Sequence, residues 1–282
     1  MDVVSTMAST IVFLFAQGGE IPIGTGFIVG YPVPTKADTV VPLIVSAKHV
    51  IADHSVVIAR FSSEEGTKPV QVQYDLNSLR EAGDVWEHPD KGVDIVVFRT
   101  PHFSQAKYFP IPLDKIATKE VFAKEDIKST DRVVFPSLLV NFMGLTRNYP
   151  VMRDGSIVLI PEEDIPLKYQ VGRNLVDTKQ PVILINATSI PGASGSPVFL
   201  YPGPRMKGGS YQLGNYTAYL LGIMHGFYPA VPRPIEEIEV STPKPFFKEN
   251  SGIAIIFPAW RLLEILDTAA FTKRMEEVIL NP

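Results

Sequence analysis

The first half of the chain alternates short apolar runs with turn-rich stretches. The runs are of strand length and rich in β-branched and aromatic residues, which favours strands over helices. Turn-rich pieces such as 31–38 and 62–69 separate them. Closely spaced strands with few helical periods predict a sandwich or barrel. The expected strands are residues 10–16, 24–29, 40–46, 55–61, 70–74 and 94–99.

The second half repeats this pattern after a break. Between residues 102 and 131 the periodicity loosens, and we expect the chain to cross there from one β unit to another. Two insertions rich in Gly or Pro interrupt the second series: 201–215 is expected to be a hairpin loop, and 228–250 an exposed, mobile excursion. The second set of expected strands is 131–135, 151–160, 181–186, 196–200, 218–225 and 252–256.

The last segment has a different period. From Pro258 to residue 279, apolar residues recur near helical spacing with charges between them, and proline suits a first helical turn. These residues are Trp260, Leu263, Leu266, Ala270, Met275 and Val278. The pattern predicts one amphipathic helix that packs its apolar stripe on the second β unit.

Composition narrows the classes of function. The chain has 282 residues, a net charge of −4 and no cysteine. This charge balance predicts no nucleic-acid partner, and the fold needs no disulfide. The apolar run at 11–16 has no Lys or Arg before it and is far too short to cross a bilayer, so it is interpreted as a first strand rather than a signal peptide. We therefore expect a cytoplasmic protein with no membrane partner.

Three polar residues lie beside strand-like runs and suggest chemistry. His49 follows the run at 40–46, Asp94 opens the run at 94–99, and Ser194 lies between two glycines just before the run at 196–200. A serine in a glycine-rich turn is weak evidence alone. In chain order, however, the residues are His, Asp and Ser, which is the set that acyl transfer through a serine nucleophile requires.

Each residue type suits one role. A serine hydroxyl needs a base in the transition state, and histidine titrates near neutral pH, so Ser194 is assigned as nucleophile and His49 as general base and then acid. Asp94 orients the imidazole. Gly192 permits an unusual backbone conformation beside the serine, so the N–H groups of Gly192 and Ser194 are expected to form the oxyanion hole.

Blander interpretations stand beside these assignments. His54 could replace His49, and Asp90 could replace Asp94, although only Asp94 is followed at once by an apolar run. The Gly24-Thr25-Gly26 run has no helix start after it, so it is interpreted as a strand edge that another backbone approaches closely, not as a phosphate loop. The histidines are scattered and cysteine is absent, so we expect no structural zinc site.

The motifs resemble a known family. The segments 24–29, 46–50, 94–97 and 192–197 together are similar to the chymotrypsin-like serine peptidases, in particular to the bacterial branch that includes glutamyl endopeptidases and HtrA protease domains. The resemblance implies an all-β fold of two antiparallel six-stranded barrels with the site between them and a C-terminal helix. It places one barrel at 1–115, the second at 116–257 and the helix at 258–282. It also implies a polypeptide substrate and no cofactor or metal.

The chain departs from the family in informative ways. Ala193 stands where animal digestive members carry an aspartate, and their Ile-Val-Gly-Gly start is missing, so activation by that cleavage is not expected. The function predicted first is a serine endopeptidase. The alternative is a latent or catalytically silent protein of the same fold, which acts through partner binding or needs an activating protein partner.

The sequence says less about substrate specificity than about catalysis. The S1 pocket of such peptidases holds P1, the side chain before the cleaved bond. The resemblance implies that this pocket is formed by residues from Thr188 to 190 and by the strand that carries His225 and Gly226. A histidine on that strand helps glutamyl peptidases hold an acidic P1 side chain. His225 lies one position later than that motif, and a one-residue shift reverses the face of a regular strand. No Asp lies near Thr188, so basic P1 residues have no evident charge partner.

Overall fold

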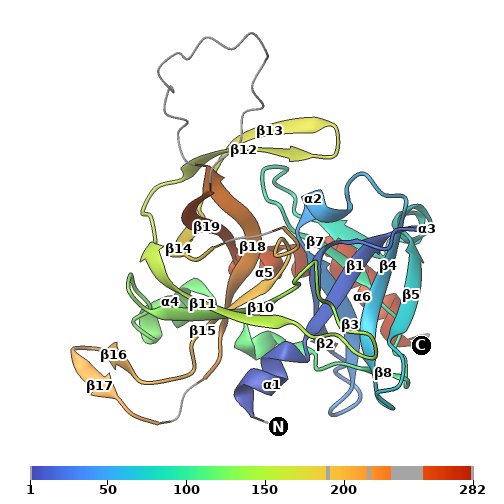
Figure 1. Ribbon diagram of the computed structural model, residues 1–282, viewed down its shortest axis with the longest axis horizontal. Helices are drawn as coiled ribbons and strands as arrows, with labels where there is room; N and C mark the ends of the chain where they lie inside the picture. The colour runs from blue at the N-terminus through green and yellow to red at the C-terminus, as the bar shows by residue number, and fades with distance from the viewer. Residues whose placement is uncertain (1, 189–190, 215–216, 230–249, 281–282) are drawn as a thin grey trace.

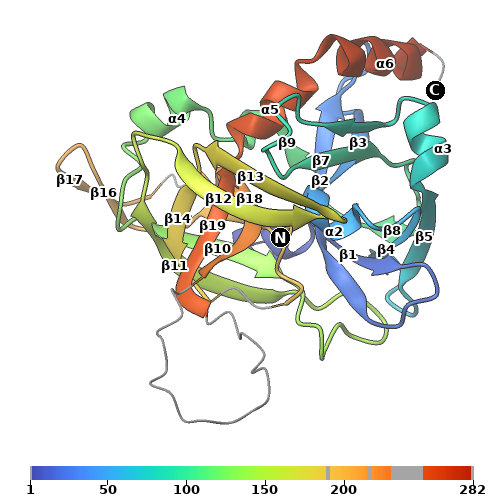
Figure 2. The same ribbon diagram turned by 90° about the horizontal axis from the view of Figure 1, so that it is seen from above.

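Figure 1 shows a computed structural model of the chain, which describes residues 2–188, 191–214, 217–229 and 250–280. Most of the insertion expected at 228–250 lies outside these residues. Within them, every expected strand is present, with bounds that differ from the sequence-based ones by a few residues at most. The described chain forms two β units side by side, as Figures 1 and 2 show from two directions.

The first unit is a nine-stranded sheet with the main order β5-β4-β1-β2-β3-β7-β6. Its pairings along this path are antiparallel, while the short β9 adds a parallel pair to β2 and β8 pairs with β4. Strand β2 is the longest and is buried over most of its length, because it runs through the middle of the sheet. The strands are β1 (Ile11–Ala16), β2 (Pro22–Pro32), β3 (Val40–Ser46), β4 (Val56–Ser63), β5 (Val70–Asp75), β6 (Val85–Glu87), β7 (Val96–Arg99), β8 (Ala106–Lys107) and β9 (Ile111–Pro112).

The second unit is a closed barrel of six strands in the order β10-β11-β14-β19-β18-β15. Closure leaves no unpaired sheet edge around the ring. The strands are β10 (Arg132–Ser137), β11 (Val151–Leu159), β14 (Ile183–Asn186), β15 (Pro197–Leu200), β18 (Leu220–Pro229) and β19 (Asn250–Pro258). All the pairings around this ring are antiparallel.

Two separate hairpins extend from the second unit. The hairpin expected within 201–215 is present as β16 (Arg205–Lys207) and β17 (Ser210–Gln212). The other, β12 (Ile165–Val171) with β13 (Asn174–Gln180), was not expected. Strand β12 contacts the helical turn α2 (Lys48–Ile51) of the first unit, and both views show the hairpin reaching toward α2 (Figures 1 and 2). This hairpin therefore covers the seam between the units.

Short helices fill the connections. The segment between β5 and β6 contains the helix α3. The loosely patterned stretch between the two units contains β8, β9, a 3₁₀ turn and α4. The bounds are α1 (Val3–Ala8), α3 (Leu76–Glu81), the 3₁₀ turn η1 (Leu113–Lys115) and α4 (Lys119–Lys124).

The C-terminal segment differs from the single helix expected over 258–282. It forms α5 (Trp260–Leu266) and α6 (Ala269–Leu280), with residues 267 and 268 between them. Helix α5 contacts β19 of the second unit, as expected. Helix α6 instead packs Phe271 against Trp86 and Tyr31 of the first unit. The break re-aims the apolar stripe, so the segment ties the units together (Figure 2).

The two units share a core. The largest cluster of buried apolar side chains contains Phe13 and Phe27 from the first unit and Phe199 and Phe257 from the second, all 3% exposed or less. Burial of aromatic side chains removes much apolar surface from water, so this cluster holds the units together. Among the described residues, no helix is long and apolar enough to span a membrane.

Candidate active site

His49 is placed by the end of β3. The strand runs directly into the short turn α2, and the backbone N–H of His49 donates to Asp94 Oδ1 at 2.9 Å. Its ring nitrogen Nδ1 lies 2.6 Å from Asp94 Oδ2. Two bonds to one carboxylate therefore fix both the backbone and the ring of His49. The His49 side chain keeps a quarter of its surface exposed, whereas that of Asp94 has none.

Asp94 precedes β7 and is buried beneath His49. Burial by itself raises the pKa of a carboxyl group, but the attraction of His49 and hydrogen bonds from His225 and His49 outweigh it and hold the pKa of Asp94 well below its usual range. Burial likewise lowers the pKa of His49, while the charge of Asp94 and the hydrogen bond to it raise that pKa above 6.5 overall. Asp94 is thus a stable anion beside an imidazole of strengthened basicity.

Ser194 lies in the loop between β14 and β15 and faces the same cluster. Its Oγ donates to the carbonyl oxygen of His225 at 3.0 Å, and within the described part of the chain it makes no hydrogen bond to His49. The glycines beside it have left-handed backbones, with φ of +92° at Gly192 and +84° at Gly195. A Cβ on Gly195 would lie 2.1 Å from the carbonyl oxygen of Thr25, so only glycine fits there.

The backbone around the serine has two unused donors. Among the described residues, the N–H groups of Gly192 and Ser194 donate to no hydrogen-bond acceptor. Their neighbours are engaged: Gly195 N–H donates to the Met224 carbonyl and Ser196 N–H to that of Ala193. Two free N–H groups on either side of Ala193 are what an oxyanion hole requires.

His225 joins the cluster from β18. Its Nδ1 lies 2.6 Å from Asp94 Oδ2, the oxygen that also binds His49. The register between β18 and β19 shifts at this point, because Met224 pairs with Ile256 and Gly226 already pairs with Ile255. His225 is thus the extra residue of a bulge, which re-aims its side chain. This local irregularity explains why strand alternation could not say which way His225 points.

Sequence reasoning missed Tyr169. It lies on β12, its ring packs edge-on against His225 with centroids 4.5 Å apart, and its hydroxyl donates to the carbonyl of Gly92 at 2.9 Å. Burial and the nearby charge of Asp94 raise the pKa of this phenol, so it remains a neutral donor. The alternation of Ile165, Leu167 and Tyr169 before a Gly-containing two-residue turn was a usable hairpin signal.

The alternative residues have other contacts. His54 lines a separate hollow with Asp53 and Arg173. Asp90 accepts from the backbone of Gly92 and from Gln180 Nε2, and so it caps a turn and ties it to β13. The Gly24–Gly26 segment approaches another backbone closely, as expected: the N–H of Thr25 donates to the carbonyl of Ser194 at 3.0 Å.

The residues proposed for specificity are only partly described. Residues 189–190 of the S1 segment lie outside the described part of the chain. Thr188 is exposed, and its carbonyl oxygen accepts a hydrogen bond from Arg153 Nη1 at 3.3 Å. Gly226 follows the bulge on β18 and has open space where a Cβ would be. The role of Thr188, His225 and Gly226 in substrate binding stays a prediction.

The cluster also contains metal-ligand atom types. One ligand atom each from His49, Asp94 and His225 lies within 4.8 Å of the others. Histidine nitrogens and carboxylate oxygens are ligands that Zn²⁺ accepts. Here both Nδ1 atoms are instead at hydrogen-bond distance from one Asp94 oxygen, so a cation at those atoms would have to replace two hydrogen bonds.

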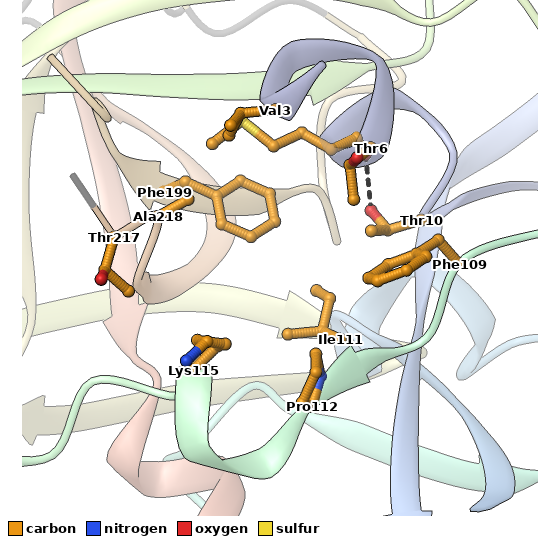
Figure 3. Close-up of a pocket in the computed structure, with 11 residues that line it drawn as sticks. Val3, Thr6, Thr10, Phe109, Ile111, Pro112, Lys115, Phe199, Thr217 and Ala218 are labelled. Atoms are coloured by element: carbon orange, nitrogen blue, oxygen red, sulfur yellow. Dashed lines mark hydrogen bonds between the residues drawn. The ribbon is translucent and has the colours of Figure 1, made fainter. Parts of the chain in front are cut away.

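A second feature is an apolar cavity of about 280 Å³ away from this cluster. Figure 3 shows it between α1, β9 and β15, with Ile111 and Phe199 on its walls and Lys115 at one side. Met7 also lines the cavity. None of His49, Asp94, Ser194 or His225 lines it. The ammonium group of Lys115 is already paired with Asp114 at 2.8 Å, so the cavity presents no free charge from that residue.

Comparison with known proteins identifies the fold. No family model and no curated sequence matches the chain. The MamO protease domain from Magnetospirillum magneticum is similar in structure, with a TM-score of 0.54, 13% identity, and coverage of 94% of this chain and all of that one. The active form of the Rv3671c protease from M. tuberculosis (TM-score 0.49, 16% identity, 94% and 82% coverage) and the HtrA-type protease AlgW with a decapeptide (0.48, 13%, 97% and 66%) also match.

The structural match and the strand order together define the fold class. One closed six-stranded barrel, a second curved β unit and a C-terminal helical segment, matched over nearly the whole chain by a protease domain, define a chymotrypsin-like serine protease fold. This confirms the chymotrypsin-like fold that the sequence motifs implied, with one correction: the second unit is the expected closed six-stranded barrel, whereas the first is a curved nine-stranded sheet in which β9 pairs in parallel with β2. At 13% identity the likeness concerns the fold, and the activity has to be argued from the residues.

Proposed function

We propose that this chain is a serine endopeptidase that cleaves polypeptides through an acyl-enzyme, with Ser194 as nucleophile, His49 as base and Asp94 as its orienting carboxylate. The observation that carries the proposal is the 2.6 Å contact between His49 Nδ1 and the buried Asp94, in a cluster that Ser194 joins through the His225 carbonyl. This supports the proposal because a histidine oriented by a buried carboxylate, with a serine in the same cluster, is the set of groups that acyl transfer uses.

The proposed chemistry uses the tautomer that this contact dictates. Asp94 is ionised and can only accept, so His49 carries its proton on Nδ1 and Nε2 is left as the base. Ser194 Oγ attacks the scissile carbonyl carbon while its proton passes to His49 Nε2. His49 then protonates the leaving amine as the C–N bond breaks. Water attacks the acyl-enzyme, giving one proton to His49, which returns it to Ser194 as the acid product leaves.

The developing oxyanion is the other requirement. The free N–H groups of Gly192 and Ser194 are the donors proposed for it, and no metal or cofactor is needed in this scheme. One side-chain rotation must precede catalysis, because Ser194 Oγ donates to the His225 carbonyl rather than to His49. Catalytic hydrogen bonds are often loose without substrate and tighten in the complex, so this rotation is compatible with an active enzyme.

The same observation favours a second candidate. A serine hydroxyl held by the His225 carbonyl is withdrawn from its base, which is the state expected of a latent protease that an activating protein partner switches on. A silent scaffold that acts only by binding is the extreme form of this alternative. The three versions make different predictions for the reactivity of one hydroxyl group.

A fluorophosphonate probe separates these versions, because it phosphonylates only an activated serine. The protein and its Ser194→Ala variant are labelled in parallel, and the modified residue is located by mass spectrometry. Labelling at Ser194 that the variant abolishes supports the endopeptidase. Labelling that begins only when a binding protein is added supports latency. A wild-type chain that binds a protein but is never labelled would overturn the proposed activity. A proteome-derived peptide library then reads out the cleaved bonds.

A further inference from the structure

Thr25 makes an unusual set of contacts for a residue in the middle of a strand. It lies on β2 of the first unit and is fully buried. Its hydroxyl donates to the carbonyl oxygen of Gly192 at 2.7 Å and accepts from the N–H of Leu138 at 3.2 Å. Its own N–H donates to the carbonyl of Ser194 at 3.0 Å. One residue of the first unit thus holds two carbonyls of the nucleophile loop in the second.

Along the chain, the two carbonyls lie on either side of the Ser194 N–H, one of the two proposed oxyanion donors. Gly192 and Ser194 carry the free N–H groups, and both of their carbonyl oxygens are bound to Thr25. A peptide carbonyl held in this way cannot turn without losing a hydrogen bond. The Gly192 carbonyl lies between the two N–H donors in the chain and the Ser194 carbonyl directly follows the second, so Thr25 restrains the backbone at both of these points. Oxyanion stabilisation depends on donors that are already oriented before reaction.

Thr25 is also connected to the segment that carries the base. Its carbonyl oxygen accepts from Ser46 Oγ at 2.8 Å, and Ser46 ends β3 shortly before His49. Gly195 packs onto the same place, since a Cβ there would lie 2.1 Å from the Thr25 carbonyl and 2.4 Å from Ser46 Oγ. The nucleophile loop and the strand that leads to the histidine therefore both contact Thr25.

We propose that Thr25 is a positioning residue that orders the oxyanion hole across the seam, through its hydroxyl bond to the Gly192 carbonyl. The proposal deepens the endopeptidase function and rests on it for its catalytic consequence. The hydroxyl is specifically required, because it donates to the Gly192 carbonyl and at the same time accepts a hydrogen bond from the N–H of Leu138. Valine has the same shape without either bond and leaves two buried backbone groups unpartnered.

The test compares Thr25→Val with Thr25→Ser and a matched control. Thr10 is also a buried threonine of the first unit, and its hydroxyl donates to the Met7 carbonyl at 2.8 Å, so Thr10→Val loses a similar bond away from the site. We expect Thr25→Val to slow fluorophosphonate labelling of Ser194 by about 10- to 100-fold, with an unchanged pH midpoint because His49 and Asp94 are untouched. Thr25→Ser and Thr10→Val should stay within about threefold of wild type.

Hydrogen exchange of the backbone gives a readout that does not need activity. The amides of Gly195 and Ser196 donate to the carbonyls of Met224 and Ala193. These amides should exchange faster in Thr25→Val but not in Thr10→Val. Wild-type rates of both labelling and exchange in a folded Thr25→Val protein would overturn the inference alone. Absence of labelling in the wild type would instead count against the endopeptidase, and the exchange comparison would still decide whether Thr25 holds the loop.

Discussion

Asp94 and His225 are joined as closely as Asp94 and His49: each imidazole places its Nδ1 2.6 Å from the same carboxylate oxygen. An ionised carboxylate can only accept, so both rings donate through Nδ1. The His225 ring is enclosed by other rings, since its centroid lies 5.3 Å from that of His49, 4.5 Å from Tyr169 and 5.6 Å from Phe257. This packing keeps the second imidazole aimed at Asp94.

Removing this second donor should weaken the support of Asp94 while leaving the proposed triad of His49, Asp94 and Ser194 in place. We expect His225→Leu to lower the rate of Ser194 labelling by about tenfold, because a buried carboxylate loses a charge-assisted hydrogen bond. His225→Asn retains an N–H donor near the position of Nδ1 and should recover most of the rate. The backbone carbonyl that binds Ser194 Oγ is present in both variants. Equal rates for the Leu and Asn variants would contradict this role for the imidazole.

The pH dependence of labelling follows from the pKa of His49. Burial lowers that pKa, but the charge of Asp94 and the hydrogen bond to it raise the pKa by more, so the net pKa lies above the ordinary 6.5. Only the neutral imidazole accepts the serine proton, so labelling should rise with pH through a midpoint above 6.5. Asp94→Asn removes the negative charge that raises the pKa of His49, while the burial that lowers it remains. The midpoint should therefore fall below 6.5, and the plateau labelling rate should fall by about 10⁴-fold. An unshifted midpoint in Asp94→Asn would contradict the conclusion that Asp94 sets the pKa of His49.

The same pair makes stability depend on pH. His49 has a raised folded pKa, so its contribution is complete below pH 6.5 and is lost as the pH rises through the folded value. Asp94 has a lowered folded pKa, so its contribution is present above pH 3.8 and is lost as the pH falls through the folded value. The gap in melting temperature between wild type and Asp94→Asn should therefore be widest between pH 3.8 and 6.5. Thermal unfolding across this range measures it.

The sequence was informative where a signal is local. Strands such as β3 were found because apolar runs with turn residues between them are a short-range pattern. His49, Asp94 and Ser194 were found because each lies beside such a run, and the structure brings His49 and Asp94 into contact. Convergence of the three could be anticipated from the family resemblance, since nothing in the spacing of residues alone specifies a distance in space.

What the sequence did not reveal depends on tertiary packing. The direction of His225 is set by a bulge, which breaks strand alternation at one residue. The break between α5 and α6 was hidden because the apolar period continues across it while the partner changes from the second unit to the first. The role of Thr25 was invisible because its hydroxyl partner is 167 residues away.

Arg153 leads to a prediction about substrate. Its Nη1 donates to the carbonyl of Thr188, in the segment expected to frame the S1 pocket, and no acidic group was found there in the sequence. A guanidinium at that place favours carboxylates. In a peptide library we expect bonds after Glu or Asp to be cleaved preferentially, and Arg153→Gln to reduce that preference by about tenfold in kcat/KM. An unchanged P1 profile in Arg153→Gln would assign specificity elsewhere.

Metal removal provides a further check. The proposed acyl transfer uses only side chains and backbone N–H groups, so treatment with a chelator should leave the labelling of Ser194 unchanged. Added Zn²⁺ should slow labelling, because the ligand atoms of His49, Asp94 and His225 lie within 4.8 Å of one another and a cation there would replace the Nδ1 hydrogen bonds to Asp94 that leave His49 Nε2 as the base. Chelator-treated protein that loses labelling and recovers it with Zn²⁺ would contradict the metal-free scheme.

Asp84 joins the first unit to the C-terminal helix. Its carboxylate is 2% exposed and binds Arg99 Nη2 at 2.7 Å and Arg274 Nε at 2.9 Å, and these bonds outweigh burial and lower the pKa of Asp84. Asp84→Asn removes the charge and keeps the shape, so we expect a loss of about 1–3 kcal/mol in the free energy of unfolding.

The pairing of Asp84 lies outside the cluster around His49, which makes stability and reactivity separable. Ser194 labelling at 25 °C should be unchanged in Asp84→Asn while the urea midpoint falls. Arg274→Gln, which removes only the helix side of the contact, should cost less, because Arg99 still pairs with Asp84 and both arginines are about a quarter exposed. If Arg274→Gln destabilises as much as Asp84→Asn, the helix α6 contact carries the whole effect, and Arg99 contributes nothing to holding Asp84.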